Sequence, residues 1–472
     1  MKPVGGLAQR ELYIDRLRAV MIALVILHHT AITYGASGGW YRHEVGVSVR
    51  PSSLLLTIFC ATNQAYFMGL LFLLAGYFTP ASLERKGYAR FLGDRFLRLG
   101  LPVAAFALTL GPLTHAMLSF AGGGGFWPDF GLLWHQKKFL CGPLWFVLTL
   151  LVFNLVYCAL RALLGAPRKA PQGAGKRFPH IGWWLLGTLG VALAALSARL
   201  LTPLRPVFDP SLAAILAAVH AQDFPCKIII LRNGEQIIVR PLWLAGALLI
   251  LGLALVPWRR IYASRHDNLF RSKPTQSPVP AWPRWLLGAV CVGAAALAIR
   301  EALPPNPGPF VYFASYIFLF AVGVIAKPRN WLPQLGWNDA RLWVILACIA
   351  WPVLPLALIF AGNGGNLDGF QSSLGILRAF WEPFVAWGII ASLLLYFRAH
   401  VNQPSRLWEW ISRRAYAVYI IHPPVLVGLT LLLHGWAAPA LVKFGVVGPL
   451  ACAATWLIAD PLVRLPGVRW VV

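Results

Sequence analysis

The chain has 472 residues, of which 58% are hydrophobic and only 12% are charged, and its mean hydropathy is +0.66. A soluble chain of this size would be about a quarter charged, so the composition excludes a soluble globular protein and indicates a membrane protein. The formal net charge of +25 does not indicate a nucleic-acid partner, because the basic residues are spread between apolar segments instead of forming one patch.

Apolar runs of about twenty residues recur along the whole chain, which predicts helices, since a membrane β-barrel would show short alternating segments. The sequence therefore predicts an all-α polytopic membrane protein, a bundle of about 10–12 transmembrane helices forming a single domain over residues 1–472. The predicted helices span approximately 14–35, 53–79, 99–120, 140–160, 181–202, 241–257, 285–303, 311–326, 343–361, 378–397, 415–434 and 443–459.

The positive charges predict the orientation of this bundle. Most of the 41 lysines and arginines fall in every second segment between the predicted helices, beginning with the segment before residue 14. Because cytoplasmic loops are enriched in Lys and Arg, both termini are predicted to be cytoplasmic. The same charges would favour contacts with membrane lipids and anionic ligands on that side.

Ionisable side chains stand at both ends of the first predicted helix, in the stretch RLRAVMIALVILHH at residues 16–29. A helix turns by about 100° and rises about 1.5 Å per residue, so Arg18 and His29 share one face, roughly 16 Å apart along the axis. Asp15 can pair with Arg18, and His28 points about 80° away from it. A histidine at membrane depth is a candidate general base or acyl carrier; the alternative is a histidine that packs between helices.

Two later predicted helices carry further ionisable groups. His422 precedes Pro423 and Pro424, which interrupt the backbone hydrogen bonds, so this point is either the wall of a site or a structural kink. Glu382 follows Arg378 by four residues, and the two can neutralise each other on one helix face. Alternatively, Glu382 orients a histidine or an acceptor hydroxyl.

Arg95 and Arg98 begin the third predicted helix at its cytoplasmic end. A helix N-terminus favours anions, so these residues together with Arg18 could bind the phosphate groups of a ligand. The alternative is that they only anchor the helix at the membrane surface.

Two predicted outer loops have unusual compositions. In residues 121–138, which are rich in glycine and aromatic residues, Trp127, Trp134 and His135 could stack on a sugar or anchor the chain at the interface. Around 203–240, Asn233–Gly234 between two β-branched runs predicts an extracellular β-hairpin at about 226–240 that covers the helical bundle, most simply as a structural lid with no chemistry. His115 and the seven cysteines, which have no C-x-x-C spacing, are interpreted as structural, and no metal site is expected.

Six stretches together resemble the membrane-bound acyltransferase-3 family, in family order across nearly the whole chain. YIDRLRAVMIALVILHH resembles that family's first helix, with D-x-L-R and then Arg-x10-His at Asp15, Leu17, Arg18 and His29. The other five stretches are YFMGLLFLLAGYFTP, FLGDRFLRLGLP, GPLWFVLTLLVFNLVY, YIFLFAVGVIA and RRAYAVYIIHPPVLV. The chain departs from the family in lacking a glutamate near Thr149, as the glucan-succinylating branch does, and in having Ala415 where a serine is usual.

The resemblance implies an O-acyltransferase of the bacterial inner membrane. It would move an acetyl or succinyl type of group from cytoplasmic acyl-CoA, a co-substrate with no other cofactor, to a hydroxyl of a carbohydrate acceptor. The residues assigned are catalytic His29, the supporting residues Asp15, Arg18, Glu382 and His422, and the donor-binding residues Arg18, Arg95 and Arg98. The alternatives are a secondary transporter with a proton relay through His29, Asp15 and Glu382, or a polysaccharide exporter.

Overall fold

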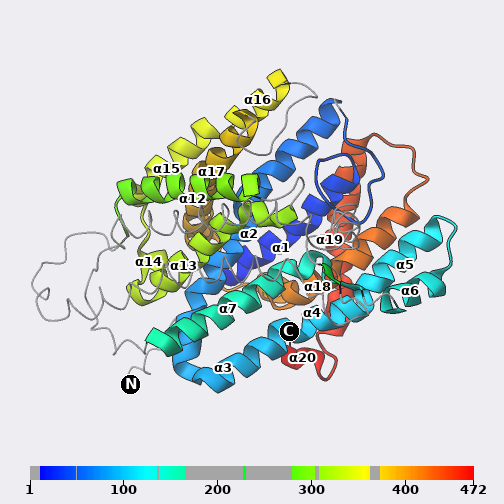
Figure 1. Cartoon of the computed structure of the whole chain (residues 1–472), viewed down its shortest axis with the longest axis horizontal. Helices are drawn as coiled ribbons and strands as arrows, with labels where there is room; N and C mark the ends of the chain where they lie inside the picture. Colours follow the sequence, from blue (N-terminus) through cyan, green and yellow to red (C-terminus); the bar gives the residue numbers. More distant parts are fainter. Residues whose placement is uncertain are drawn as a thin grey trace, which may run out of the picture.

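The computed structural model describes residues 11–48, 50–135, 138–164, 227–229, 279–302, 308–361 and 373–471. Within these ranges ten helical segments are long and apolar enough to cross a membrane. They coincide with ten of the twelve predicted helices, and the two remaining predictions, 181–202 and 241–257, lie outside the described residues. The prediction of an all-α polytopic membrane protein is confirmed (Figure 1).

The N-terminal half is helical from the first described residues. Its elements are α1 (Leu12–Thr33), α2 (Pro51–Lys86), α3 (Tyr88–Arg95), η1 (Phe96–Gly100), α4 (Leu101–Ala105), η2 (Phe106–Leu110), α5 (Gly111–Ala121), α6 (Phe126–His135), η3 (Gly142–Leu144) and α7 (Trp145–Leu164). The run from α3 to α5 forms one membrane-length segment, Tyr88–Ala121.

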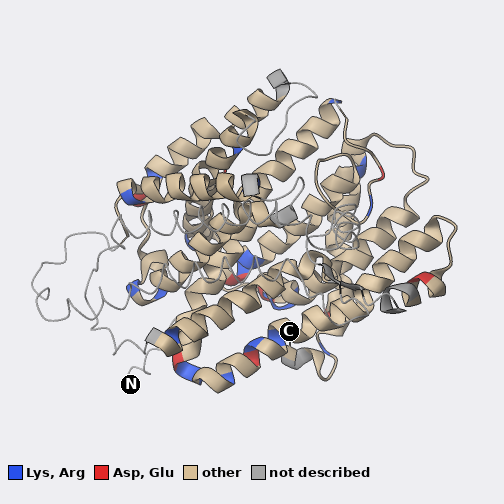
Figure 2. Cartoon of the chain, in the orientation of Figure 1, with Lys and Arg blue, Asp and Glu red and all other residues tan. Residues whose placement is uncertain are grey.

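The C-terminal half is also built from helices. Its elements are α12 (Trp282–Ala302), η5 (Gly308–Tyr312), α13 (Phe313–Arg329), α14 (Trp331–Gln334), α15 (Trp337–Ala350), α16 (Val353–Ala361), α17 (Ser373–His400), α18 (Arg406–Leu432), α19 (Ala440–Leu462) and α20 (Val468–Val471). Lys, Arg, Asp and Glu are sparse along these helices and are more frequent near helix ends and on α3 (Figure 2).

Helix α1 lies inside the bundle, because it packs against α2, α17, α18 and α19. Its side chains are buried on nearly every face, including Leu17, Met21 and Ile26. A helix whose middle turns, residues 19–27, are apolar on every side is expected in such a central position. The position of α1 therefore carries its two histidines into the interior of the protein, away from lipid.

Among the described helices, α2 and α13 make the most extensive pair. Their backbones approach closely at Gly76 and Gly323: a methyl group at Gly76 would overlap the carbonyl oxygen of Phe320, and one at Gly323 would overlap the carbonyl oxygen of Leu73. Small residues allow this kind of close packing in membranes, where water does not drive helices together.

The third membrane segment contains two short π-helical turns, η1 and η2, each followed by a proline. Pro102 has no N–H to donate to the carbonyl of Arg98, four residues earlier. That carbonyl instead accepts a hydrogen bond from the Tyr416 hydroxyl at 2.6 Å. The irregular segment is thereby attached to α18, close to the positions of the predicted donor-binding arginines.

Contacts between helix ends agree with helices that alternate in direction. At one face the backbone N–H of Tyr13 donates to Asn402 Oδ1 at 3.1 Å. At the other face Lys443 Nζ lies 2.6 Å from Glu44 Oε1. The assignment of the first face to the cytoplasm stays a prediction from the positive charges.

Two short strands lie beside the helices: β1 (Lys138–Leu140) and β2 (Lys227–Ile229) pair antiparallel, with Lys138 opposite Ile229. β2 belongs to the first β-branched run of the predicted hairpin at 226–240. The rest of that hairpin, including Asn233 and Gly234, lies outside the described residues.

Candidate functional site

Two histidines from opposite ends of the chain meet inside the bundle. His29 Nδ1, on α1, lies 3.2 Å from His422 Nε2, on α18, and the two rings are nearly parallel, with 2° between their planes. His422 is fully buried and His29 is half-buried. A hydrogen bond between two imidazoles needs one nitrogen to donate and the other to accept, so the accepting ring is neutral.

The backbone around Pro423 determines which nitrogen of His422 carries the proton. Pro423 has no N–H, so it leaves the carbonyl of Tyr419, four residues earlier, without its helical donor. His422 Nδ1 lies 2.7 Å from that carbonyl oxygen. Because a carbonyl only accepts, Nδ1 carries the hydrogen, and in the neutral ring Nε2 is an acceptor. His29 Nδ1 then donates to it, which leaves the lone pair of His29 on Nε2.

An indole covers the face of His29. The Trp40 ring stacks on the His29 imidazole with 3.8 Å between centroids and 10° between planes. Trp40 belongs to the segment after α1, and this segment is held at its far end by Glu44, whose Oε1 lies 2.6 Å from Lys443 Nζ. An aromatic face favours a cation above it, so Trp40 stabilises a protonated His29.

His28 faces different neighbours, as the helical geometry of the sequence predicts. Its ring lies 5.2 Å from the Phe67 ring, and its carbonyl oxygen lies 3.6 Å from Cys60 Sγ, both on α2. His28 is buried at 8% exposure. It therefore packs α1 against α2, whereas His29 faces α18.

Arg18 lies at the opposite end of α1 from His29. Its Nη1 lies 3.5 Å from Asp15 Oδ1, and its guanidinium carbon lies 4.8 Å from the Phe78 ring centroid. The side chain is 36% exposed, so its remaining donors are accessible to a ligand. The helix thus has an accessible cation at one end and a half-buried histidine at the other.

Arg95 and Arg98 lie near the same end of the bundle. Arg98 is 51% exposed and pairs with Asp94 at 3.2 Å, while the Arg95 guanidinium lies 4.6 Å from the Phe91 ring centroid. The third membrane segment begins on the side of the bundle where α1 begins, because α1 and α2 each cross it once. The structure therefore places the three predicted donor-binding arginines on the same side of the bundle.

Glu382 lies elsewhere, between two arginines. Arg300 Nη2 donates to both of its carboxylate oxygens at 2.8 Å, and Arg378 Nε donates to Oε1 at 3.1 Å. The pair with Arg378 is the self-neutralising contact that the four-residue spacing indicates. Among the described residues, the polar contacts of Glu382 are with arginines and not with a histidine.

The other predicted residues have simpler surroundings. The ring of His115 lies edge-on to Tyr41 at 5.3 Å, beside the segment that carries Trp40. Burial raises the pKa of the Tyr41 phenol, and Cys141 adds a smaller effect, so this hydroxyl stays protonated. Trp127 is 76% exposed on α6. The side chains of Trp134 and His135 lie outside the described residues.

Several residues that contact the predicted site residues could not have been identified from the sequence. Trp40 lies in a loop, and the carbonyl of Tyr419 has no side-chain identity to detect. Arg300 ends an apolar helix, where its burial marks it as unusual. Lys327 counts as a cytoplasmic charge by sequence, yet its Nζ lies 4.4 Å from the Tyr77 ring centroid and 5.5 Å from that of Phe78, the ring that Arg18 also covers.

A hollow of about 390 Å³ lies between α15 and α17, lined mainly by apolar residues such as Val344, Ala347 and Ile389. Neither His29 nor His422 lines it. The hydrogen-bond geometry of the histidine pair is therefore the better guide to the chemistry.

Comparison with known proteins gives a match along most of the chain. A family model described as an acyltransferase domain matches residues 11–208 and 233–460. Glucans biosynthesis protein C of Escherichia coli strain K12 is 30% identical over 158 residues, which are 33% of this chain and 39% of that protein. The proteins of the same name from strain SMS-3-5 and from O1:K1 / APEC match to the same extent. The match thus covers well under half the length of these relatives. No solved structure matches the chain.

Proposed function

Since the chain belongs to the acyltransferase-3 family, as its motifs indicate and the family model confirms, we propose that it transfers an acyl group from acyl-CoA to a hydroxyl of a carbohydrate acceptor. The observation that carries this proposal is the hydrogen bond between His29 on α1 and His422 on α18, since α1 also presents Arg18 at its other end. The name of the partly matching relatives, Glucans biosynthesis protein C, supports a glucan as the class of acceptor.

The donor binds at the cytoplasmic end of the bundle. Arg18, Arg95 and Arg98 lie on the same side of the bundle and suit the phosphates of CoA, because a guanidinium group can donate two parallel hydrogen bonds to phosphate oxygens. The thioester end of the donor is uncharged and extended, so it can enter the bundle along α1 towards His29. Arginine and anion would pair here without the cost of burying the phosphates in lipid.

His29 acts as the general base through Nε2. The acceptor hydroxyl gives its proton to Nε2 while its oxygen attacks the thioester carbonyl carbon; an ester C–O bond forms, the C–S bond breaks, and the CoA thiolate leaves and takes the proton from His29. His422 Nε2 accepts from His29 Nδ1–H throughout, and this hydrogen bond strengthens when His29 is positively charged. Trp40 stabilises the same cation from its face.

The acceptor approaches from the opposite face of the membrane. His29 lies within the last turn and a half of α1, close to the segment that carries Trp40 and Tyr41. Flat aromatic side chains with polar tips suit contacts with sugars. With the Lys- and Arg-rich face in the cytoplasm, the product would leave on the outer side of the bacterial inner membrane.

Purified full-length protein in nanodiscs tests the proposal. We expect acetyl-CoA or succinyl-CoA to release free CoA when a glucan oligosaccharide is present, and mass spectrometry to find the acylated glucan. Arg18→Gln should raise KM for acyl-CoA by about tenfold with little change in kcat, because it removes one phosphate contact. Absence of CoA release by the unmodified protein with every donor and glucan would reject acyl transfer.

A further inference from the structure

Arg300 is a buried cation that does not use all of its hydrogen-bond donors. Its side chain is 0% exposed, and Nη2 donates to both carboxylate oxygens of Glu382 at 2.8 Å. Its Nε and Nη1 are buried and have no hydrogen-bond acceptor in the part of the chain that the structure describes. Buried N–H groups of a guanidinium are normally all bonded, so donors left over in this place need an explanation.

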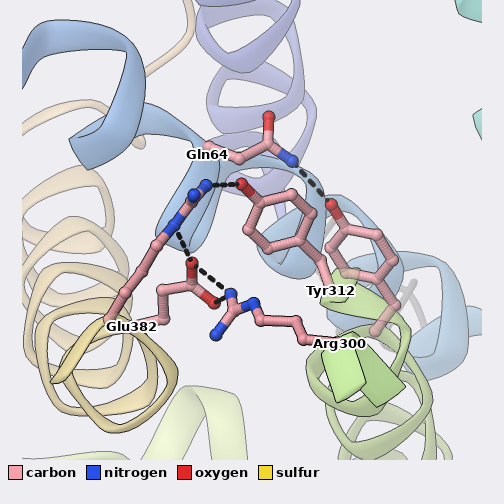
Figure 3. Close-up of polar contacts among 6 residues, drawn as sticks. Gln64, Arg300, Tyr312 and Glu382 are labelled. Atoms are coloured by element: carbon pink, nitrogen blue, oxygen red, sulfur yellow. Dashed lines mark hydrogen bonds and ion pairs between the residues drawn. The ribbon is translucent and has the colours of Figure 1, made fainter. Parts of the chain in front are cut away.

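A second arginine and two tyrosines complete the cluster, as Figure 3 shows. Arg378 Nε donates to Glu382 Oε1 at 3.1 Å, and its Nη2 donates to the Tyr312 hydroxyl. Next to them Gln64 Nε2 donates to the Tyr316 hydroxyl at 2.9 Å. The polar side chains come from α2, α12, α17 and the η5–α13 segment, and they point towards one another inside a largely apolar bundle.

The ion pair of Arg378 with Glu382 would satisfy that carboxylate without Arg300. Arg300 adds a second guanidinium to a single carboxylate, in a place where an uncompensated charge is costly. The planar guanidinium fork matches a carboxylate in shape and charge better than any other protein donor does. An incoming carboxylate would give the unused donors of Arg300 an acceptor.

Some members of the cluster are less deeply buried than Arg300. Arg300 is fully buried, but the side chain of Arg378 is 19% exposed and Tyr312 and Gln64 are half-buried. Gln64 follows Cys60 by one helical turn, and Cys60 Sγ contacts the carbonyl of His28 at 3.6 Å. The cluster therefore lies within about one turn, along α2, of the level of the histidines.

We propose that Arg300 and Arg378 bind a carboxylate group carried by a substrate, with Glu382 holding the two guanidinium groups together. The proposal rests on the acyl transfer proposed above and adds a charged group to its substrate. The carboxylate belongs either to the acyl group, as in a dicarboxylic acyl chain, or to the acceptor.

A donor pair distinguishes the two sources. Arg300→Gln is expected to fold, because Glu382 keeps Arg378 as its partner. If the acyl group carries the carboxylate, R300Q raises KM for succinyl-CoA by about tenfold and leaves acetyl-CoA within about twofold. If the acceptor carries the carboxylate, R300Q raises KM for a carboxylated oligosaccharide and leaves KM for a neutral one unchanged. This result should be the same with acetyl-CoA and with succinyl-CoA. An equal effect on both donors and both acceptors would contradict the proposal.

Two matched variants check these results. Arg300→Lys keeps the charge but loses the fork, so we expect a KM for succinyl-CoA between those of the unmodified protein and R300Q. Arg413→Gln removes an arginine that is 66% exposed, and it should leave KM for both donors unchanged. A loss of activity in R300K that is as large with acetyl-CoA as with succinyl-CoA would point to packing instead of carboxylate binding.

A binding measurement separates this proposal from the proposed function. Succinate should raise the unfolding temperature of the full-length protein, the neutral analogue succinamide should not, and R300Q should lose the succinate effect. If no donor releases CoA but this pattern holds, acyl transfer fails and the carboxylate site stands. Suppose instead that the donors release CoA, but succinate and succinamide have the same effect on the unfolding temperature. If R300Q also leaves KM for both donors and both acceptors unchanged, the proposal of a carboxylate site is wrong.

Discussion

His29 Nδ1 and His422 Nε2 lie 3.2 Å apart, although 393 residues separate them in the chain. The hydrogen bond of this pair has a fixed direction, from His29 to His422, because the carbonyl of Tyr419 accepts from the other nitrogen of His422, Nδ1, at 2.7 Å. The order of donors and acceptors runs from that carbonyl through His422 to His29, and it ends in a lone pair on His29 Nε2. A base with a neighbour that holds its ring and accepts its second N–H is the arrangement that general-base catalysis needs.

Replacement of His29 by alanine should abolish acyl transfer. General-base contributions are typically about 10² to 10⁴-fold, so kcat should fall by at least about a hundredfold. CoA release and mass spectrometry of the glucan measure this loss. Transfer within about threefold of the unmodified rate in H29A would remove His29 from the chemistry.

His28 supplies the matched control for that experiment. Its ring packs on Phe67 and not on His422, so His28→Gln should keep kcat within about threefold while it lowers the unfolding temperature slightly. Equal losses in H28Q and H29A would indicate that both changes act through folding of α1.

Replacement of Pro423 by alanine should slow catalysis without weakening binding. An N–H at position 423 can donate to the Tyr419 carbonyl, and it would compete there with His422 Nδ1. His422 would then populate the other tautomer, in which Nε2 carries hydrogen and no longer accepts from His29. We expect kcat to fall by about tenfold with KM for acyl-CoA unchanged, measured as initial rates of CoA release.

Pro424 is the control for this prediction, since it lies next to Pro423 in the same helix. It leaves the carbonyl of Ile420, and not that of Tyr419, without its helical N–H donor. Pro424→Ala should change kcat by less than about threefold. A larger loss in P424A than in P423A would mean that the kink, and not the tautomer of His422, matters.

The sequence predicts the helical part of this fold well because its signal is local. Apolar runs place all ten membrane-length helices that the structure describes, and helical periodicity separates His29 from His28 within one segment. The outer loops are harder, because their structure depends on distant partners: Lys227–Ile229 pairs with Lys138–Leu140, which no local pattern in either segment indicates.

The site is only half predictable for the same reason. Arg18 and His29 share one helix, so their spacing can be read directly. The contact of His29 with His422 and the stacking of Trp40 depend on packing between segments that the sequence leaves independent. Glu382 has a local partner in Arg378, which the spacing predicts. Its second partner, Arg300, comes from another helix, so the sequence does not predict that Glu382 belongs to a cluster of three charged groups.

Trp40 should affect the rate through its ring. A cation–π contact contributes about 0.5 to 2 kcal/mol, so loss of the indole in Trp40→Leu should lower kcat about 2- to 30-fold. Trp40→Phe keeps an aromatic face and should retain more activity than W40L. The kcat values of the two variants measure this order, and a W40F rate no higher than that of W40L would show that the aromatic face does not contribute.

Alkaline pH should lower the free energy of unfolding of the protein through Tyr34, which follows α1. Burial and the nearby Glu44 raise the pKa of Tyr34 to about 12. A tyrosine in the unfolded chain ionises near pH 10, so above about pH 10 the unfolded state loses a proton that the folded state keeps, and stability falls. The loss is about 1.4 kcal/mol per pH unit for this group until the pH reaches the folded pKa.

Tyr34→Phe isolates that contribution. The Tyr34 hydroxyl has no hydrogen-bond partner among the described residues, so its removal should cost little stability at neutral pH. Thermal unfolding between pH 8 and about pH 11 should show a smaller loss for Y34F than for the unmodified protein. Parallel curves for the two proteins would show that Tyr34 does not titrate differently on unfolding.

The crossing of α2 and α13 should tolerate no side chain at Gly323. A methyl group there overlaps the carbonyl oxygen of Leu73, so Gly323→Ala has to push the two helices apart. Overpacking of this kind costs roughly 1 to 3 kcal/mol, and we expect a clear fall in the unfolding temperature in nanodiscs. Gly93→Ala is the control, because no atom lies within 4 Å of the added methyl group, and alanine should stabilise its helix slightly. A G323A protein as stable as G93A would mean that the contact can relax without loss of packing.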